Sequence, residues 1–176
     1  MKLSILTCTR NPRPEVFARV LEAISRQTLP MDQWEHFVID NASNPPVSGL
    51  EAVKKHPFVK LLHEDRVGKG WAEIRGIEAS SGELVVIVDD DNILAPDYLA
   101  KAVEMMDRYP FLGILGGMGK GEFEGRVEPW MEDFLPQLGV NQDCSNEVDG
   151  LQYAMIKRVG PWLPIGADSS GRDLLS

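Results

Sequence analysis

Hydrophobic and polar positions alternate along the chain with two different periods, which predict strands and helices in turn. Short apolar runs of strand length occupy residues 2–7, 36–40, 58–63, 83–88 and 111–117. Between these runs, apolar residues recur at helical spacing within residues 11–28, 48–56, 71–82 and 96–110. Strands that alternate with helices favour an α/β fold, in which a mainly parallel sheet is the middle of three α/β/α layers.

The same pattern makes local predictions about two of the helices. Asn11 precedes the first helix and is of a residue type that caps helix N-termini, so we expect it to be the cap. In the third helix Trp71, Ile74 and Ile77 fall on one side.

Polar residues follow several of the predicted strands at their carboxyl ends. Thr7 follows the first strand, Asp40 the second, and Asp89, Asp90 and Asp91 the fourth and most apolar strand. In open parallel sheets, ligands bind beyond the carboxyl ends of the strands. The sequence therefore predicts that these residues form one site.

The three consecutive aspartates are the strongest chemical signal. Two carboxylates ~4 Å apart repel by roughly 4 kcal/mol at an effective dielectric constant near 20. A divalent Mg²⁺ or Mn²⁺ ion held by Asp89 and Asp91 would remove that repulsion, because such ions take oxygen ligands and complete their shell with phosphates. The alternative is a capping cluster ahead of the helix that begins near Pro96, which would use only one aspartate.

Two weaker signals accompany the aspartates. Asp40 and Asn41 could accept hydrogen bonds from a ribose hydroxyl or a base, or could simply form an Asx turn. Gly68 and Lys69 precede a helix whose first backbone N–H groups could meet a phosphate. Their spacing is not that of a P-loop.

Composition limits the partners of the chain. Its 176 residues carry a net charge of −9 without a basic cluster, which argues against a nucleic-acid surface. An acidic protein that handles phosphates needs a bridging cation. Neither a membrane-spanning apolar run nor a signal peptide is present in the sequence. We therefore expect a cytoplasmic protein that can lie at the periphery of a membrane.

Four segments resemble family 2 glycosyltransferases with the GT-A fold. They read SILTCTRN with VLEAISRQT, then FVIDNAS, VGKGWAEIRGIEASSGEL and VVIVDDDNILAPDYL. They occur in the family's order over residues 3–99, and include its serine-any-glutamine pattern at Ser25 and Gln27 and its DxD signature at Asp89 and Asp91.

The resemblance implies a nucleotide-diphospho-sugar donor and, in general, inversion of the anomeric centre. It places Thr7, Thr9, Asp40 and Asn41 around the base and ribose, and Asp89 at the ribose or the metal. We expect the nucleotide-sugar site to include Gly68, Lys69, Arg75 and Asp90 as well. The resemblance assigns Asp89 and Asp91 to a Mn²⁺ or Mg²⁺ ion. The acceptor, which can be a glycan, a lipid or a protein, is not indicated.

The chain departs from the family pattern in two places. The arginine of the family's Gly-x-x-x-x-Arg-Asn stretch is matched by Glu73, so Lys69 or Arg75 would have to serve the diphosphate. The family's aspartate base lies in a later acidic motif, for which Asp173 is the one nearby and weak candidate. We therefore expect residues 1–118 to form the donor-binding core and residues 119–176 to begin an acceptor-side region that is incomplete.

Two other functions remain open from the sequence. A GT-A domain without its base could bind a sugar nucleotide and transfer nothing. A Mg²⁺-dependent phosphotransfer or receiver domain would also place acidic residues at a strand end. It needs a lysine at a later strand end, where only Lys120 is available.

Overall fold

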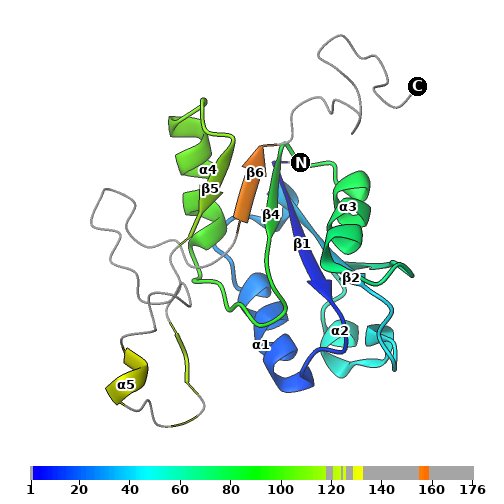
Figure 1. The fold of residues 1–176 in the computed structure, drawn as a ribbon. Helices are drawn as coiled ribbons and strands as arrows, with labels where there is room; N and C mark the ends of the chain where they lie inside the picture. The colour runs from blue at the N-terminus through cyan, green and yellow to red at the C-terminus, as the bar shows by residue number, and fades with distance from the viewer. Residues whose placement is uncertain (1, 118–120, 124, 126–128, 133–154, 159–176) are drawn as a thin grey trace, which may run out of the picture.

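The central layer of the fold is a sheet, shown in Figure 1. The computed structural model describes residues 2–117, 121–123, 125, 129–132 and 155–158. Within them the sheet has six strands in the order β3-β2-β1-β4-β6-β5. The strands are β1 (Leu3–Thr9), β2 (Trp34–Asp40), β3 (Val59–His63), β4 (Leu84–Ile87), β5 (Ile114–Gly116) and β6 (Met155–Arg158). The pairs β1–β2, β2–β3 and β1–β4 are parallel, which confirms the mainly parallel sheet.

Helices cover both faces of this sheet. The α-helices are α1 (Pro14–Ser25), α2 (Glu51–Lys55), α3 (Lys69–Ala79), α4 (Tyr98–Arg108) and α5 (Pro129–Glu132), with 3₁₀ turns at Met31–Gln33 and Val47–Gly49. Side chains alternate across β1, so that Ile5 packs with α1 and α4 while Leu6 packs with α3 on the other face. The three-layer prediction is therefore confirmed. None of the described helices has the length and apolar character needed to cross a membrane.

The last strands differ from the sequence-based expectation. The apolar run at 111–117 forms a strand only over Ile114–Gly116, and Phe111 and Ile114 are 81% and 60% exposed. β6, which the sequence did not predict, lies between β4 and β5 and runs antiparallel to both. Part of the segment that follows residue 118 thus enters the same sheet, through a pairing between residues distant in sequence that local patterning cannot indicate.

The start of α1 also differs from its prediction. Arg13, not Asn11, occupies the N-cap, and no side chain caps the helix. Asn11 has a positive φ of 53°, and its Oδ1 accepts a hydrogen bond from the amide of Asn44 at 2.8 Å. Pro14 begins the helix instead, because its fixed φ suits the first turn and its missing N–H is not needed there. Asn11 therefore links two loops rather than capping a helix.

The face of α3 that packs on the sheet coincides only in part with its apolar side, because Ile77 packs there and Trp71 does not. Ala72 and Gly76 are its buried residues, while Trp71 is 44% exposed. A Cβ on Gly76 would lie only 2.9 Å from Cδ1 of Ile39 and 3.0 Å from Cδ1 of Leu6. The helix approaches the sheet through its smallest residues, and this close approach turns Trp71 outward.

We expect Gly82→Ala to destabilise the protein because Gly82 touches the backbone of the central strand. A Cβ there would lie 2.6 Å from the carbonyl carbon of Leu3 and from the amide nitrogen of Ser4. Neither atom can move without distorting β1, so the free energy of unfolding should fall by about 1–3 kcal/mol in denaturant titration. Gly49→Ala is the control, since nothing lies within 4 Å of its Cβ position. Equal losses in the two variants would contradict the steric explanation.

Candidate functional site

The parallel register brings the polar strand ends to one edge of the sheet. Thr9 of β1 is paired with Asp40 of β2, and Asp40 with His63 of β3. On the other side of β1, the amide of Val88 donates to the carbonyl of Leu6 at 2.9 Å, which continues the β1–β4 register toward the aspartates. These strand ends therefore lie along one edge of the sheet.

The three aspartates point in different directions from a tight turn. The amide of Asn92 donates to the carbonyl of Asp89 at 3.1 Å, which closes the turn. Asp89 forms an ion pair with Lys69, the first residue of α3, and Asp90 accepts a hydrogen bond from the hydroxyl of Thr9. Asp91 is exposed. The cluster is thus held from two sides of the sheet.

The charge of this cluster is only partly compensated. Burial raises the pKa of Asp90, and the neighbouring charges of Asp91 and Asp89 raise it further against the opposing hydrogen bond from Thr9. Burial alone would lower the pKa of Lys69, but its contact with Asp89 outweighs this and raises it. Lys69 therefore stays charged beside a surplus of negative charge.

The structure does not use these aspartates as a helix cap. α4 begins at Tyr98, and its N-cap residue is Asp97, whose side chain makes no cap hydrogen bond. The segment between the aspartates and α4 is held by Gln27, whose Nε2 donates to the carbonyl of Ala95 at 2.7 Å and whose Oε1 accepts from the amide of Leu99 at 3.0 Å. The capping explanation of the aspartate run is wrong, and the glutamine of the family's motif fixes the loop behind the run.

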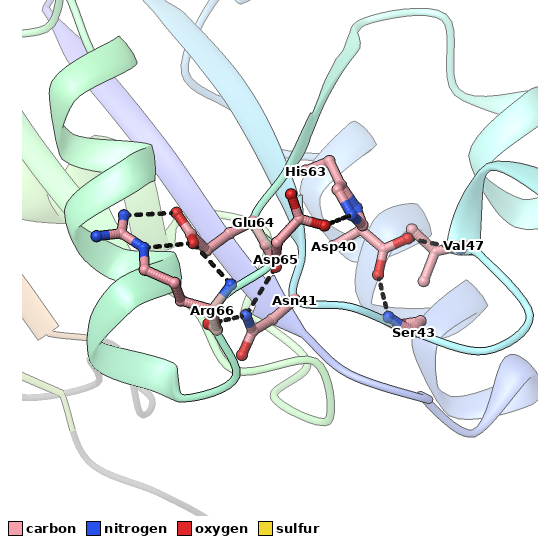
Figure 2. A network of polar contacts seen from close by, with 8 residues as sticks. All are labelled: Asp40, Asn41, Ser43, Val47, His63, Glu64, Asp65 and Arg66. Carbon is pink, nitrogen blue, oxygen red and sulfur yellow. Dashed lines mark hydrogen bonds and ion pairs between the residues drawn. The ribbon is translucent and has the colours of Figure 1, made fainter.

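Asp40 is committed to its own loop, as Figure 2 shows. Its Oδ1 accepts from the amide of Ser43 at 2.9 Å and its Oδ2 from the amide of Val47 at 3.0 Å. Burial alone would raise the pKa of Asp40, but these hydrogen bonds, with the hydroxyl of Ser43, hold it below its usual value. Asp40 therefore shapes the loop after β2 as a charged residue.

Asn41 organises the neighbouring loop, also seen in Figure 2. Its Nδ2 donates to the carbonyls of Glu64 at 3.0 Å and Arg66 at 2.7 Å. Its Oδ1 accepts from the amide of Gly68 at 2.7 Å, a glycine that has a positive φ of 141° at the N-cap of α3. One amide side chain thus fixes residues 64–68 and the start of the helix that carries Lys69.

Sequence reasoning missed a second cation at this loop. The guanidinium of Arg66 contacts the buried carboxylate of Glu64 through two nitrogens, at 2.8 and 2.9 Å, and holds the pKa of Glu64 at about 2. The same guanidinium lies 4.1 Å from the centre of the Trp71 ring. The spacing of Glu64 and Arg66 matches no helix or strand period, so the sequence did not indicate the contact of Arg66 with Glu64 and the Trp71 ring.

The remaining predicted residues are divided between the site and the core. Thr7 is fully buried, and its hydroxyl lies 2.9 Å from Nε2 of His36, a histidine whose burial lowers its pKa to about 3. Thr9, two residues later, carries the hydroxyl that reaches the aspartates.

Arg75 is exposed and acts electrostatically on Glu64, and among the described residues no ion pair joins it to the aspartates. Asp173 and Lys120 lie outside the described residues.

The donor atoms of the cluster suit a hard divalent cation but do not enclose one. In the part of the chain that the structure describes, no group of three or more histidine, cysteine or acidic residues is arranged to hold a metal ion. Mg²⁺ is commonly bound through one or two carboxylates and the phosphates of a substrate. Asp89 and Asp91 fit that mode better than a closed protein cage.

Comparison of the sequence with known proteins gives consistent relatives. An N-acetylglucosaminyltransferase of Bradyrhizobium elkanii is 41% identical over 125 residues, which cover 69% of this chain and 66% of the relative. One from Bradyrhizobium diazoefficiens is 34% identical over 125 residues, 69% of this chain and 25% of the relative. An uncharacterized glycosyltransferase of Bacillus subtilis, YwdF, is 28% identical over 112 residues and is covered to 41%. The chain thus spans less than half the length of the last two.

Solved structures share the fold. The mannosyltransferase PcManGT from Pyrobaculum calidifontis, in complex with GDP-Man and Mn²⁺, superposes with a TM-score of 0.60 at 28% identity, over 68% of this chain and 36% of that one. S. aureus TarS 1-349 in complex with UDP-GlcNAc gives 0.59 at 23% identity, over 73% and 37%. The family model for glycosyl transferase family 2 matches residues 4–161, and the chain belongs to that family, with the GT-A fold.

Proposed function

We propose that this chain is the donor-binding part of a glycosyltransferase that binds a nucleotide-diphospho-sugar at the carboxyl edge of the sheet and transfers the sugar to an acceptor. One observation carries the proposal: at this edge, in a chain of the family, Lys69 of α3 pairs with Asp89, and Thr9 of β1 bonds to the next residue, Asp90. The acceptor can be a glycan, a lipid or a protein. A phosphotransfer function has no comparable support, since the family match concerns sugar transfer.

The relatives suggest which donor to test first. The two Bradyrhizobium proteins named N-acetylglucosaminyltransferase are 34% and 41% identical to this chain, which favours UDP-N-acetylglucosamine. The Pyrobaculum mannosyltransferase was solved with GDP-mannose, which makes that sugar nucleotide the natural comparison. Binding of UDP against binding of GDP therefore distinguishes the two donor classes.

Asp89 and Asp91 are the proposed ligands of a Mn²⁺ or Mg²⁺ ion. Their carboxylate oxygens are the donors that these ions prefer. Three carboxylates in succession face one paired cation, Lys69, so a divalent ion would relieve their mutual repulsion. When bound, such an ion would offset the charge that develops on the leaving nucleoside diphosphate.

The chain's other residues divide into those that face the donor and those that position them. Lys69 is the proposed cation for the diphosphate in preference to Arg75, because it lies beside Asp89. Thr9 and Asp90 hold one another at the strand ends. Asp40 and Asn41, whose polar atoms bond to the loops, are positioning residues for the nucleotide pocket.

Transfer further requires a base that takes the proton of the acceptor hydroxyl as it attacks the anomeric carbon. A single displacement of this kind inverts the anomeric centre. Asp173 remains the weak candidate for the base. The alternative, a domain that binds the donor without transfer, differs in one measurement: donor binding would be seen by calorimetry while no sugar is transferred to any acceptor or to water.

UDP or GDP binding should require a divalent ion. Without one, a diphosphate would meet a cluster whose net charge is negative, in a chain of net charge −9. We expect calorimetric affinity for the preferred nucleotide to be about tenfold or more higher in Mn²⁺ than in EDTA. Equal affinities in Mn²⁺ and in EDTA would contradict the proposal that binding depends on a metal ion.

Asp91→Asn should remove the metal-dependent part of nucleotide binding and leave the fold intact. Because the substitution relieves like-charge repulsion, the melting temperature should stay the same or rise. Asp32→Asn is the matched control, since Asp32 is exposed in the 3₁₀ turn before β2. An Asp91 variant that unfolds would show that the aspartate run is structural.

Asp40→Asn should destabilise the protein in a pH-dependent way. The new amide would turn an N–H donor toward the amide of Ser43 or Val47, at a cost of about 1–3 kcal/mol at pH 7. The pKa of Asp40 is lowered in the folded state, so its stabilising contribution is present above the unfolded value and is lost as the pH falls through the folded one. The stability gap between wild type and variant should therefore narrow below about pH 4. A gap that is constant from pH 7 to pH 3 would contradict a role for the charge.

A further inference from the structure

One of the proposed metal ligands already forms an ion pair with a lysine. Lys69, at the start of α3, contacts Oδ1 of Asp89, twenty positions along the chain and beyond the end of β4. The side chains of Lys69 and Asp89 are 57% and 43% exposed, so both are open to an entering ion and neither is fixed by burial. The contact depends on the loop that Asn41 holds, because that loop places the N-terminus of α3.

Lys69 has a second acidic neighbour on its own helix. Glu73 lies one turn further along α3, at the spacing at which charged side chains of a helix interact, and its charge also acts on Lys69. Asp90, by contrast, is bonded to Thr9, and no described lysine or arginine forms an ion pair with Asp91. Lys69 is therefore the cation that occupies the aspartate cluster, and it has another partner within reach.

We propose that Lys69 is an internal counter-ion that competes with the divalent ion for Asp89 and is released to the diphosphate of the donor when that ion binds. The inference rests on the proposed function. An ammonium group and a divalent cation on one carboxylate repel each other, so binding of the ion favours release of Lys69 from Asp89. A diphosphate then offers Lys69 a new partner.

This competition couples the ion and the donor. Alone, the ion binds against the cost of breaking the Lys69–Asp89 pair. Together with a diphosphate, the same displacement creates a new ion pair, and each ligand raises the affinity of the other by the same factor. The lysine would thus keep Asp89 paired until donor and ion arrive together.

The first test measures Mn²⁺ alone, by the electron paramagnetic resonance signal of the free ion. Lys69→Met should bind Mn²⁺ about fivefold more tightly than wild type, the upper range for an exposed ion pair. Lys2→Met is the charge-matched control. Lys2 pairs with Asp107 at 3.1 Å at the opposite end of β1, about 20 Å away and beyond the Debye length of about 8 Å. The affinity of Lys2→Met for Mn²⁺ should stay within about twofold of that of wild type.

The second test repeats the titrations with UDP present. UDP should strengthen Mn²⁺ binding by a smaller factor in Lys69→Met than in wild type, because the released lysine is missing. Unchanged or weaker binding of Mn²⁺ alone by Lys69→Met, equal tightening in Lys2→Met, or an undiminished effect of UDP would each overturn the proposal. Lys69→Gln is a second neutral replacement for comparison. Melting curves confirm that each variant is folded.

These outcomes separate the inference from the proposed function. If wild type binds UDP equally well in Mn²⁺ and in EDTA, the metal-dependent function fails, whatever Lys69 does. If wild type requires Mn²⁺ for UDP but Lys69→Met leaves the affinity for Mn²⁺ alone unchanged, only the counter-ion role fails. If wild type shows no binding of Mn²⁺ alone, detectable binding by Lys69→Met supports the proposal and its absence overturns it.

Discussion

Negative charge at the end of a buried strand is the constraint on which the site depends. β4 is buried along its whole length and leads within two residues into Asp89, Asp90 and Asp91. The fold relieves the repulsion by sending neighbouring aspartates to opposite sides, one to Lys69 on α3 and one to Thr9 on β1. These two contacts leave part of the negative charge uncompensated. That remaining charge could attract a cation and, through the cation, a phosphate.

The loops around this edge are held by side-chain hydrogen bonds, and the loop after β2 also by the apolar packing of Val47. Asp40 and Asn41 are consecutive residues at the end of β2, yet they serve different loops, because side chains of successive strand residues leave opposite faces of the sheet. Asp40 holds residues 43–47, and Asn41 holds residues 64–68. Under the proposed function, a donor bound at this edge would meet preformed backbone positions, which lowers the entropy lost on binding.

The residues of a family motif can therefore have two kinds of role: some position other residues, and others contact the ligand. Gln27 does not approach the aspartates, but it ties the end of α1 to the backbone on both sides of the start of α4. Asp40 and Asn41 match a family motif and bond to the backbone of the loops that follow β2 and β3. These motif residues hold other residues in position, and under the proposed function the contacts with the donor and the ion fall to a smaller set that includes Asp89 and Lys69.

The sequence by itself determined the α/β order, the parallel strands β1 to β4 and the aspartates at a strand end, because these follow from the short periods of apolar residues and from the direction of the chain. Tertiary structure decided the rest. It selected Ala72 and Gly76 over Trp71 as the buried side of α3, since only small residues let the helix approach Leu6 and Ile39 on the sheet. It also inserted β6 between β4 and β5 and paired Lys69 with Asp89, contacts between residues distant in sequence whose geometry no local pattern specifies.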